Sequence, residues 1–373
     1  PVGRIAVQKR IVLKNCGLVD PKSIQSFLNK GGFAALEKAR ETMTPENVID
    51  EVTTSGLLGR GGAGFSCGLK WKLAREQSAD RKFIVCNADE GEVGTFKDRY
   101  ILQNDPFSLI EAIAIGGWTI GADKAFIYLR GEYHFLSGLI LNAIRQAKNK
   151  GFLDHMDIEL REGAGAYMCG EESGLMNSIE GLRGEARYKP PFPAQVGLYG
   201  QPTTINNTES LASVPVILER GGQWFLQQGL PNNGGLKLFS VTGHVEKPDN
   251  FEVPLGTPFK DLLAMAGGVK GGRKLKAVIP GGSSTPVVPG EVMMGVTMDY
   301  DAIAKAGSML GSGAVIVLAE GTDMVKVLAN LAHFYAAESC GQCTPCREGT
   351  GWLSRVLHRL LHGQGRTEDL ELL

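Results

Sequence analysis

Residues 82–179 alternate between short apolar runs and longer amphipathic stretches, and this alternation constrains the fold more than any other feature of the chain. The runs expected to form buried strands are 82–86, 125–129 and 157–160. The stretches expected to form helices are 105–120, 132–148 and 170–179. A repeated strand–helix order requires right-handed crossovers and a mostly parallel sheet, which binds its ligands at the carboxyl ends of the strands. We therefore expect an α/β domain whose ligand loops are 87–94 and 163–172.

Changes in sequence texture divide the chain into four expected parts. Residues 1–43 are a lead segment with one helix, and residues 44–235 are the α/β domain. Residues 236–320 contain short strands joined by turns and read as a small α+β module. Residues 321–373 begin with a helix capped by Thr322 and contain a group of cysteines. No stretch reaches the ~18 unbroken apolar residues that a membrane span needs, so no direct membrane span is expected.

The charge balance and the cysteine usage narrow the functional classes. Lys and Arg number 39 and Asp and Glu 40, so the formal net charge is -1. This balance argues against nucleic acid or an anionic membrane surface as the main partner. Three of the seven cysteines fall within seven residues, which fits a metal site in a reducing compartment better than a disulfide framework.

The cysteines Cys340, Cys343 and Cys346 have the C-x2-C-x2-C spacing of [4Fe–4S] sites, in which a fourth ligand comes from elsewhere. Zinc usually pairs C-x2-C with a second, distant pair, so the third Cys favours iron–sulfur over the two alternatives, zinc and an unliganded set. No Cys follows Cys346. The fourth ligand is therefore a group other than Cys, a residue beyond 373, or one of the four remaining cysteines, Cys16, Cys67, Cys86 and Cys169.

A glycine-rich loop at 59–64 satisfies G-x-G-x-x-G, but a helix is expected before it instead of a strand, so it is not the usual dinucleotide fingerprint. Consecutive glycines still let main-chain N–H groups approach a phosphate or a ring system, and the helix that follows adds its positive end. A flexible linker is the alternative interpretation. The neighbouring side chains of Arg60, Phe65 and Lys70 favour a ligand loop, because linkers rarely carry such groups.

Four further segments have the composition of ligand loops, and each has a plainer alternative. The acidic residues of 87–94 suit ribose hydroxyls, or a solvated turn. In 163–172, Glu171 and Glu172 either face a ligand or simply stabilise the start of a helix. The cations and aromatics of 187–193 could clamp phosphates and stack on a ring, or form an ordinary loop. The amides of 203–208 could bind flavin or phosphate, or form an Asx turn.

These signals together suggest an electron path from a nucleotide to an iron–sulfur cluster. Nicotinamide gives up two electrons as a hydride, whereas a cluster accepts one electron at a time. A chain that joins them needs a converter that works in single-electron steps, and flavin is the usual one.

Six ordered motifs over about residues 40–360 carry a family resemblance: GRGGAGF-x2-G-x-KW, NADEGEVGTFKDR, GAGAYMCGEESGLM, KPPFPA, INNTES and SCGQCTPCREG. The chain resembles the NADH-binding flavoprotein subunit of respiratory complex I. It is equally similar to the diaphorase subunits of NAD-linked formate dehydrogenases and of NAD-dependent or electron-bifurcating hydrogenases. The resemblance implies a Rossmann-like FMN and NADH domain, a ubiquitin-like β-grasp module and a C-terminal helical [4Fe–4S] domain. It implies an NADH dehydrogenase subunit that accepts hydride onto FMN and passes single electrons to the cluster.

The resemblance also assigns site residues. The expected FMN contacts are Gly59, Arg60, Gly61, Gly62, Gly64, Lys70, Asn87, Asp89, Glu90, Tyr167, Gly170, Glu171, Asn206, Asn207 and Thr208. The expected NADH contacts are Phe65, Glu92, Glu172, Lys189 and Phe192, and the cluster ligands are Cys340, Cys343 and Cys346. Hydride transfer needs no side-chain acid or base, so positioning supplies the catalysis. Among the site residues, Glu92 and Glu172 are the ones assigned to the catalytic centre.

The resemblance finally implies partners and a location. The partners are expected to be a thioredoxin-like [2Fe–2S] subunit and a larger multi-cluster subunit, and the location cytoplasmic, or peripheral on the cytoplasmic side of a membrane complex. In the family the fourth cluster Cys lies roughly forty residues after the third, which would place it beyond residue 373. A non-enzymatic iron–sulfur carrier or scaffold is the alternative function. The intact set of Glu92, Glu172 and Lys189 favours the enzyme.

Overall fold

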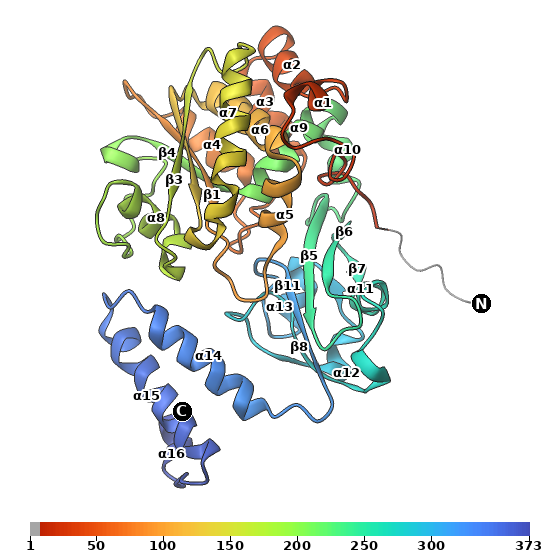
Figure 1. Ribbon diagram of the computed structural model, residues 1–373, viewed down its shortest axis with the longest axis vertical. Coiled ribbons are helices and arrows are strands. Elements are labelled where there is room, and N and C mark those ends of the chain that lie inside the picture. The colour runs from red at the N-terminus through yellow and green to blue at the C-terminus, as the bar shows by residue number, and fades with distance from the viewer. Residues whose placement is uncertain (1–7) are drawn as a thin grey trace, which may run out of the picture.

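The computed structural model describes residues 8–373 and has three parts (Figure 1). The largest part is built on four parallel strands in the order β3-β2-β1-β4. Their bounds are β1 Phe83–Ala88, β2 Lys124–Leu129, β3 Asp157–Glu162 and β4 Thr203–Asn207. The three predicted strands are confirmed. The segment 203–208, for which a turn was one interpretation, forms the fourth strand and the first residue of the helix after it.

Alternate residues along the strands point to two separate hydrophobic cores, as the period of two in a strand requires. Ile84 and Cys86 of β1 pack in the main core, whereas Phe83 and Val85 pack in a smaller one on the opposite face. The main core lies under helices that include α3 Pro45–Thr54, α4 Cys67–Arg75, α6 Pro106–Ile120, α7 Ser137–Asn149, α9 Thr208–Arg220 and α10 Gly222–Leu226. The smaller core lies under α8 Glu172–Ile179. Both faces of the sheet are therefore covered, as parallel sheets require.

The lead segment contributes to the main core. It forms α1 Ile24–Leu28 and α2 Ala34–Thr42, the second of which was not predicted from the sequence. Phe27, Phe33 and Leu36 are all buried against the same apolar residues as α6. This packing brings the main-chain N–H groups at the start of α2 next to a buried acid of α6, Glu111. Its Oε1 accepts hydrogen bonds from the N–H groups of Ala35 and Leu36, at 3.1 and 3.2 Å.

Burial raises the pKa of Glu111 from 4.5 to about 7, although the main-chain hydrogen bonds oppose the shift. Between these two values the folded state holds the proton more tightly than the unfolded chain does. The contribution of this group to stability therefore falls as the pH rises from about 4.5 to about 7, and its cost is fully present above that window.

We expect Glu111→Gln to become progressively more stable than the wild type across this window, because Gln stays neutral and still offers an oxygen to the start of α2. The stability difference, variant minus wild type, should grow by on the order of 3 kcal/mol between pH 4.5 and pH 8. Urea unfolding of both proteins at the two pH values measures it. A difference that is the same at both values would contradict the expectation.

The second part is a five-stranded mixed sheet in the order β6-β5-β11-β8-β9. Its strands are β5 Leu236–Gly243, β6 Asp249–Pro254, β8 Leu275–Ile279, β9 Val288–Pro289 and β11 Ala314–Ala319. The last strand, β11, lies parallel beside the first, β5, and α11 Phe259–Met265 packs on the same apolar core. A last strand inserted beside the first is the ubiquitin-like β-grasp arrangement that the family resemblance implied.

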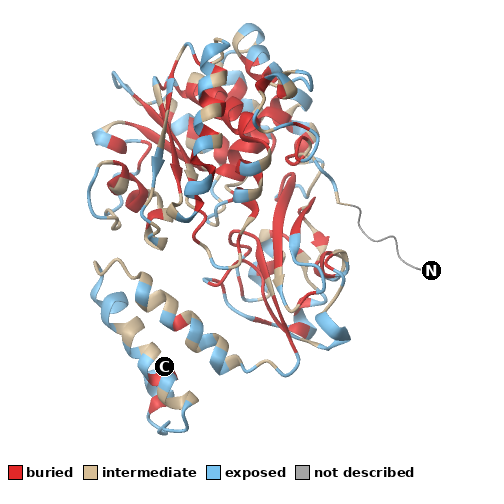
Figure 2. Ribbon diagram, in the orientation of Figure 1, coloured by how far each residue is buried: buried red, intermediate tan, exposed pale blue. Residues whose placement is uncertain are grey.

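The third part is helical and consists of α14 Met324–Glu338, α15 Thr344–Leu361 and α16 Asp369–Leu372. The N-cap of α14 is Asp323, whose carboxylate accepts two main-chain N–H bonds, and not Thr322 as the sequence suggested. Figure 2 shows that α14 and α15 are mostly exposed or half-buried, unlike the other two parts. Among the described residues, no helix combines the length and the apolar character needed to cross a membrane.

Candidate functional site

The carboxyl ends of β1 and β4 meet at the point where the chain changes direction across the sheet. From β1 the chain adds β2 and β3 on one side, and it then returns to add β4 on the other. Asn207 is the last residue of β4 and is paired in register with Asn87, the residue before the end of β1. The glycine loop lies here, since a Cβ placed on Gly61 would be 3.1 Å from Cβ of Asn207. Such a switch point is where open α/β sheets bind ligands, so the sheet supplies the context that the local sequence lacked.

The glycine loop presents free hydrogen-bond donors at this point. None of the main-chain N–H groups of residues 61–64 donates a bond of normal geometry to any other described residue. Gly62 and Gly64 have φ values of 131° and 66°, which side-chain-bearing residues rarely adopt. Ser66 then caps α4, and Lys70 lies in the first turn of that helix. Unpaired N–H groups next to a helix start and a lysine fit a bound phosphate.

The loop also contacts the β-grasp module. A Cβ on Gly64 would lie 3.1 Å from the ring of Tyr300, whose hydroxyl donates to the carbonyl of Gly59 at 3.1 Å. The guanidinium of Arg60 is fully buried and donates to the carbonyls of Gly234 and Leu236, both at 2.9 Å. The side chain of Arg60 therefore ties the loop to the start of β5, and its main-chain N–H is also engaged, donating to Oγ of Ser210 at 2.8 Å.

The residues Asn87, Asp89 and Glu90, in and after the end of β1, have different surroundings. Asn87 donates from Nδ2 to the carbonyl of Gly170 at 2.8 Å, which joins this loop to the loop after β3. Burial raises the pKa of Asp89 to about 7, against the attraction of Arg130. Glu90 turns inward, because its carboxylate accepts the N–H groups of Asp98 and Arg99 at 2.8 and 3.0 Å. Both N–H groups belong to the first turn of α5 Lys97–Asn104, so the carboxylate of Glu90 is already hydrogen-bonded within the protein.

Two lysines and two glutamates predicted for the site are brought together by the structure. Lys189 donates to Glu171 at 2.9 Å and to Glu172 at 2.6 Å. Lys70 lies 3.9 Å from Glu172 and donates to the carbonyl of Ile205 at 2.9 Å. The predicted aromatics Phe65 and Phe192 are 46% and 55% exposed, so their rings are available to a ligand. The arrangement alternates positive and negative groups along one edge of the site.

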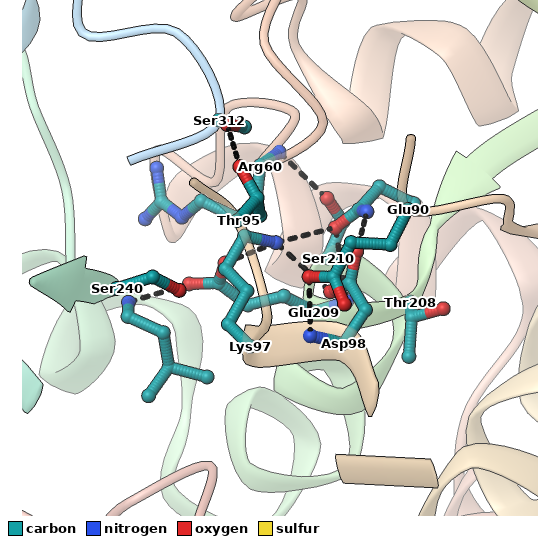
Figure 3. A network of polar contacts seen from close by, with 12 residues as sticks. Arg60, Glu90, Thr95, Lys97, Asp98, Thr208, Glu209, Ser210, Ser240 and Ser312 are labelled. Carbon is teal, nitrogen blue, oxygen red and sulfur yellow. Dashed lines mark hydrogen bonds and ion pairs between the residues drawn. The ribbon is translucent and has the colours of Figure 1, made fainter. Parts of the chain in front are cut away.

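A buried charge network lies beneath the switch point and was not predicted from the sequence (Figure 3). Lys97 is fully buried, 2.9 Å from Asp98 and 2.8 Å from Glu209, and the three side chains point toward one another. Asp98 accepts from Nδ2 of Asn207 at 2.6 Å, so the network fixes the amide that ends β4. Lys237 of β5 lies 3.7 Å from Glu209 and donates to the carbonyl of Ser312 at 2.9 Å. The network thus joins the sheet to the β-grasp module.

Of the three clustered cysteines, Cys340 lies in the turn between α14 and α15, Cys343 is the N-cap of α15, and Cys346 lies in the first turn of that helix. Cys343 and Cys346 are exposed and Cys340 is half-buried. The turn is fixed to the α/β domain, since Arg183 donates to the carbonyl of Cys340 at 2.7 Å and Gln342 to that of Ala186 at 2.8 Å. In the described residues, no three His, Cys, Asp or Glu side chains converge as the ligands of a single metal ion would. A four-iron cluster does not need that convergence, because each thiolate binds a different iron atom.

The other four cysteines are buried thiols in separate places. Cys67 and Cys86 pack in the main core, Cys169 in the core under α8, and Cys16, in the lead segment, in a further small core. Burial raises the pKa of all four, to about 12 for Cys16 and Cys86, so these thiols stay protonated at neutral pH.

The fold and the two sites define a class of protein, an α/β flavoprotein with an iron–sulfur centre on separate helices, and comparisons with known proteins agree. The Nuo51 FMN-binding domain matches residues 52–216, the SLBB domain 238–297, and the NADH-ubiquinone oxidoreductase-F iron–sulfur binding region 326–373. The F 2 subunit of NADH-quinone oxidoreductase in Rhizobium meliloti (strain 1021) is 45% identical, covering 97% of this chain and 88% of its own. The F subunit of the same enzyme in Rickettsia bellii (strain OSU 85-389) is 48% identical, covering 95% and 85%. The chain belongs to the family of these NADH-quinone oxidoreductase F subunits.

Solved structures show the same fold. The crystal structure of an NAD+-reducing [NiFe]-hydrogenase in the air-oxidized state contains a chain that superposes with a TM-score of 0.85 at 35% identity. The match covers 94% of this chain and 60% of the hydrogenase chain. This chain therefore spans less than two thirds of that protein, although it spans most of the curated relatives.

Proposed function

We propose that the protein is the NADH-oxidising flavoprotein subunit of a multi-subunit complex. The observation that carries the proposal is the glycine loop, whose unpaired main-chain N–H groups lie at the switch point between β1 and β4. The family membership points the same way, since its matched domains are named for FMN and for an iron–sulfur centre. A carrier or scaffold that had lost nucleotide binding would have no need to keep this loop unpaired.

The residues around the switch point would hold FMN. Main-chain N–H groups of Gly61, Gly62 and Gly64 would bind its phosphate together with Lys70, and Asn87, Asn206, Asn207 and Thr208 would line the remaining polar edge. When bound, FMN supplies a centre that accepts a hydride and gives up its electrons one at a time. Gly170 would allow close approach to the acidic loop, since a Cβ there would lie 3.3 Å from the carbonyl of Asp89. The chain itself contributes position and charge, and no proton acceptor is required.

The charged edge of the site would hold NADH. Lys189 and Lys70 can exchange their carboxylate partners for the phosphates of the nucleotide, because both are partly exposed. The released Glu171 and Glu172 would then accept from hydroxyl groups. Phe65 and Phe192 would cover the adenine and exclude water. Glu92 would be the acceptor nearest to the nicotinamide.

Cys340, Cys343 and Cys346 would hold the cluster, which when bound accepts single electrons. The exposed turn that carries them leaves the centre open to a partner protein. A thioredoxin-like [2Fe–2S] subunit and a larger multi-cluster subunit are the partners we propose. The host could be complex I, a formate dehydrogenase or a bifurcating hydrogenase, with this subunit on the cytoplasmic side.

The purified protein should contain one FMN, and NADH should bleach the flavin absorbance without oxygen. Glu92→Gln should raise KM for NADH about tenfold, the loss expected when a hydrogen bond loses its charge, and leave flavin content unchanged. Anaerobic titration and steady-state kinetics with ferricyanide measure both. Reconstituted protein that binds no flavin would refute the function and leave the carrier as the remaining hypothesis. Loss of FMN in Glu92→Gln alone would instead show that this residue holds the flavin.

A further inference from the structure

The carboxylate of Glu92 is held by residues from two different domains. Oε2 accepts the hydroxyl of Tyr167 at 2.9 Å, from the loop after β3. Oε1 accepts the hydroxyl of Ser283 at 2.8 Å, and Ser284 donates from both its N–H and its hydroxyl, at 3.0 and 2.8 Å. Gly282 makes this close approach possible, because a Cβ there would lie 2.4 Å from Cγ of Glu92. The position of the carboxylate therefore depends on the β-grasp loop 282–284.

A third domain reaches Glu92 through Ser283. The hydroxyl of Tyr335, on α14, lies 2.7 Å from the hydroxyl oxygen of Ser283. A serine hydroxyl has one hydrogen, and Ser283 uses it on a carboxylate that can only accept. The hydrogen between the two hydroxyls must therefore come from Tyr335. The chain of donors runs in one direction, from Tyr335 through Ser283 to Glu92.

The same turn of α14 is fixed to the site by packing. The rings of Phe334 and Tyr335 meet the ring of Tyr167 edge to face, with centroids 5.4 and 5.9 Å away. Glu338 accepts the main-chain N–H of Tyr167 at 2.9 Å. These contacts lie close in sequence to Cys340. The helix that leads into the cysteine turn is thus packed against Tyr167, one of the residues that hold Glu92.

We propose that Tyr335 is a positioning residue for nucleotide binding, acting through Ser283 on Glu92. The proposal rests on the proposed function, in which Glu92 contacts NADH. It links the docking of the iron–sulfur helices to the affinity for the nucleotide, because Tyr335 of α14 orients the Ser283 hydroxyl that Glu92 accepts. In this proposal Tyr335 acts through its hydrogen bond to Ser283.

The test is Tyr335→Phe in the full cofactor-loaded chain, because Phe keeps the ring packing and removes only the hydroxyl. We expect Kd for NAD+, measured by titration calorimetry, and KM for NADH to rise about three- to tenfold, the range for one lost hydrogen bond. The kcat with ferricyanide, the flavin content and the iron content should stay within twofold of the wild type. Ser283→Ala should have a similar effect, and adding Tyr335→Phe to it should change Kd by less than twofold. Tyr100→Phe, whose hydroxyl makes no hydrogen bond to another described residue, is the matched control.

The outcomes separate this inference from the proposed function. If wild-type flavin is bleached by NADH but Tyr335→Phe binds NAD+ as the wild type does, the positioning role is refuted and the function stands. Independent effects of the two substitutions would also refute it, because residues in one relay must not add. If Tyr335→Phe loses iron or flavin in proportion to its loss of affinity, the residue is structural and the proposal fails.

Discussion

Lys97→Met should lower the free energy of unfolding by about 3–5 kcal/mol, the range seen when one partner of a buried ion pair is removed. Lys97 is fully buried between Asp98 and Glu209, at 2.9 and 2.8 Å. Although burial opposes it, these two acids raise the pKa of Lys97 above its ordinary value, so the ammonium is charged. Its removal leaves two carboxylates facing each other in a buried region of the fold.

The neighbouring lysine, Lys237, replaces it only in part, because its ammonium is also held by the carbonyl of Ser312 at 2.9 Å. Burial lowers the pKa of Lys237 to about 7, although the negative charge of Glu209 acts to raise it. The ammonium nitrogen of Lys237 lies 3.7 Å from the carboxylate of Glu209. At neutral pH Lys237 is therefore only partly charged, whereas Lys97 carries the full charge of the network. The same loss should release Asn207, which Asp98 fixes, so flavin affinity should fall together with stability.

Urea unfolding followed by circular dichroism measures the change. Lys148→Met is the matched control, because Lys148 and Asp157 form an exposed pair at 3.3 Å and exposed pairs contribute at most about 1 kcal/mol. A loss in Lys97→Met no larger than in the control would mean that water reaches the network and that its charges are not stabilised by one another.

Much of the α/β fold could be predicted from local sequence, because its central strands are apolar on both faces. The apolar runs around Ile84 and Ile127 are typical of strands in a parallel sheet, because such strands are buried on both faces. Strand β4 was missed because Thr and Asn residues in it look like a turn. Its polar side chains are satisfied inside the fold: Thr203 accepts the N–H of Leu198 at 2.9 Å, and Thr204 accepts from Asn206 at 3.2 Å. Such bonds join residues whose pairing no local pattern reveals.

The candidate site could also be predicted in part: its local motifs were found from the sequence, and the distant residues that fix them were not. Glycines, acids and lysines of the ligand loops are local motifs, and the ion pairs of Lys189 join residues that the motifs had already singled out. The partners that fix them come from distant segments: Tyr300 against the glycine loop, and Ser283 and Tyr335 behind Glu92. Sequence composition gives no sign of these contacts, because Ser and Tyr are ordinary in a β-grasp loop or on a helix face. Only the topology brings them together.

Cys343→Ser should remove the iron–sulfur absorbance and lower the iron content from about four atoms per chain to less than one, because a hydroxyl is a poor ligand for iron beside two thiolates. The protein should still bind FMN, and NADH should still bleach it, because the glycine loop and the charged edge belong to a different domain. Iron analysis, the visible spectrum and an anaerobic NADH titration measure the three quantities on one preparation.

Loss of iron in this variant would not come from unfolding of the turn. Cys343 is the N-cap of α15, with extended backbone angles and no side-chain hydrogen bond to the helix. Serine is among the preferred residues at that position, since its oxygen can accept a main-chain N–H of the first turn. The substitution should therefore leave α15 as stable as before or stabilise it, and circular dichroism should be unchanged. Cys16→Ala, which removes a buried thiol beside Leu13, should keep all its iron. Full iron content in Cys343→Ser would exclude this residue from the cluster, and loss of flavin bleaching would show that the two centres depend on each other for binding.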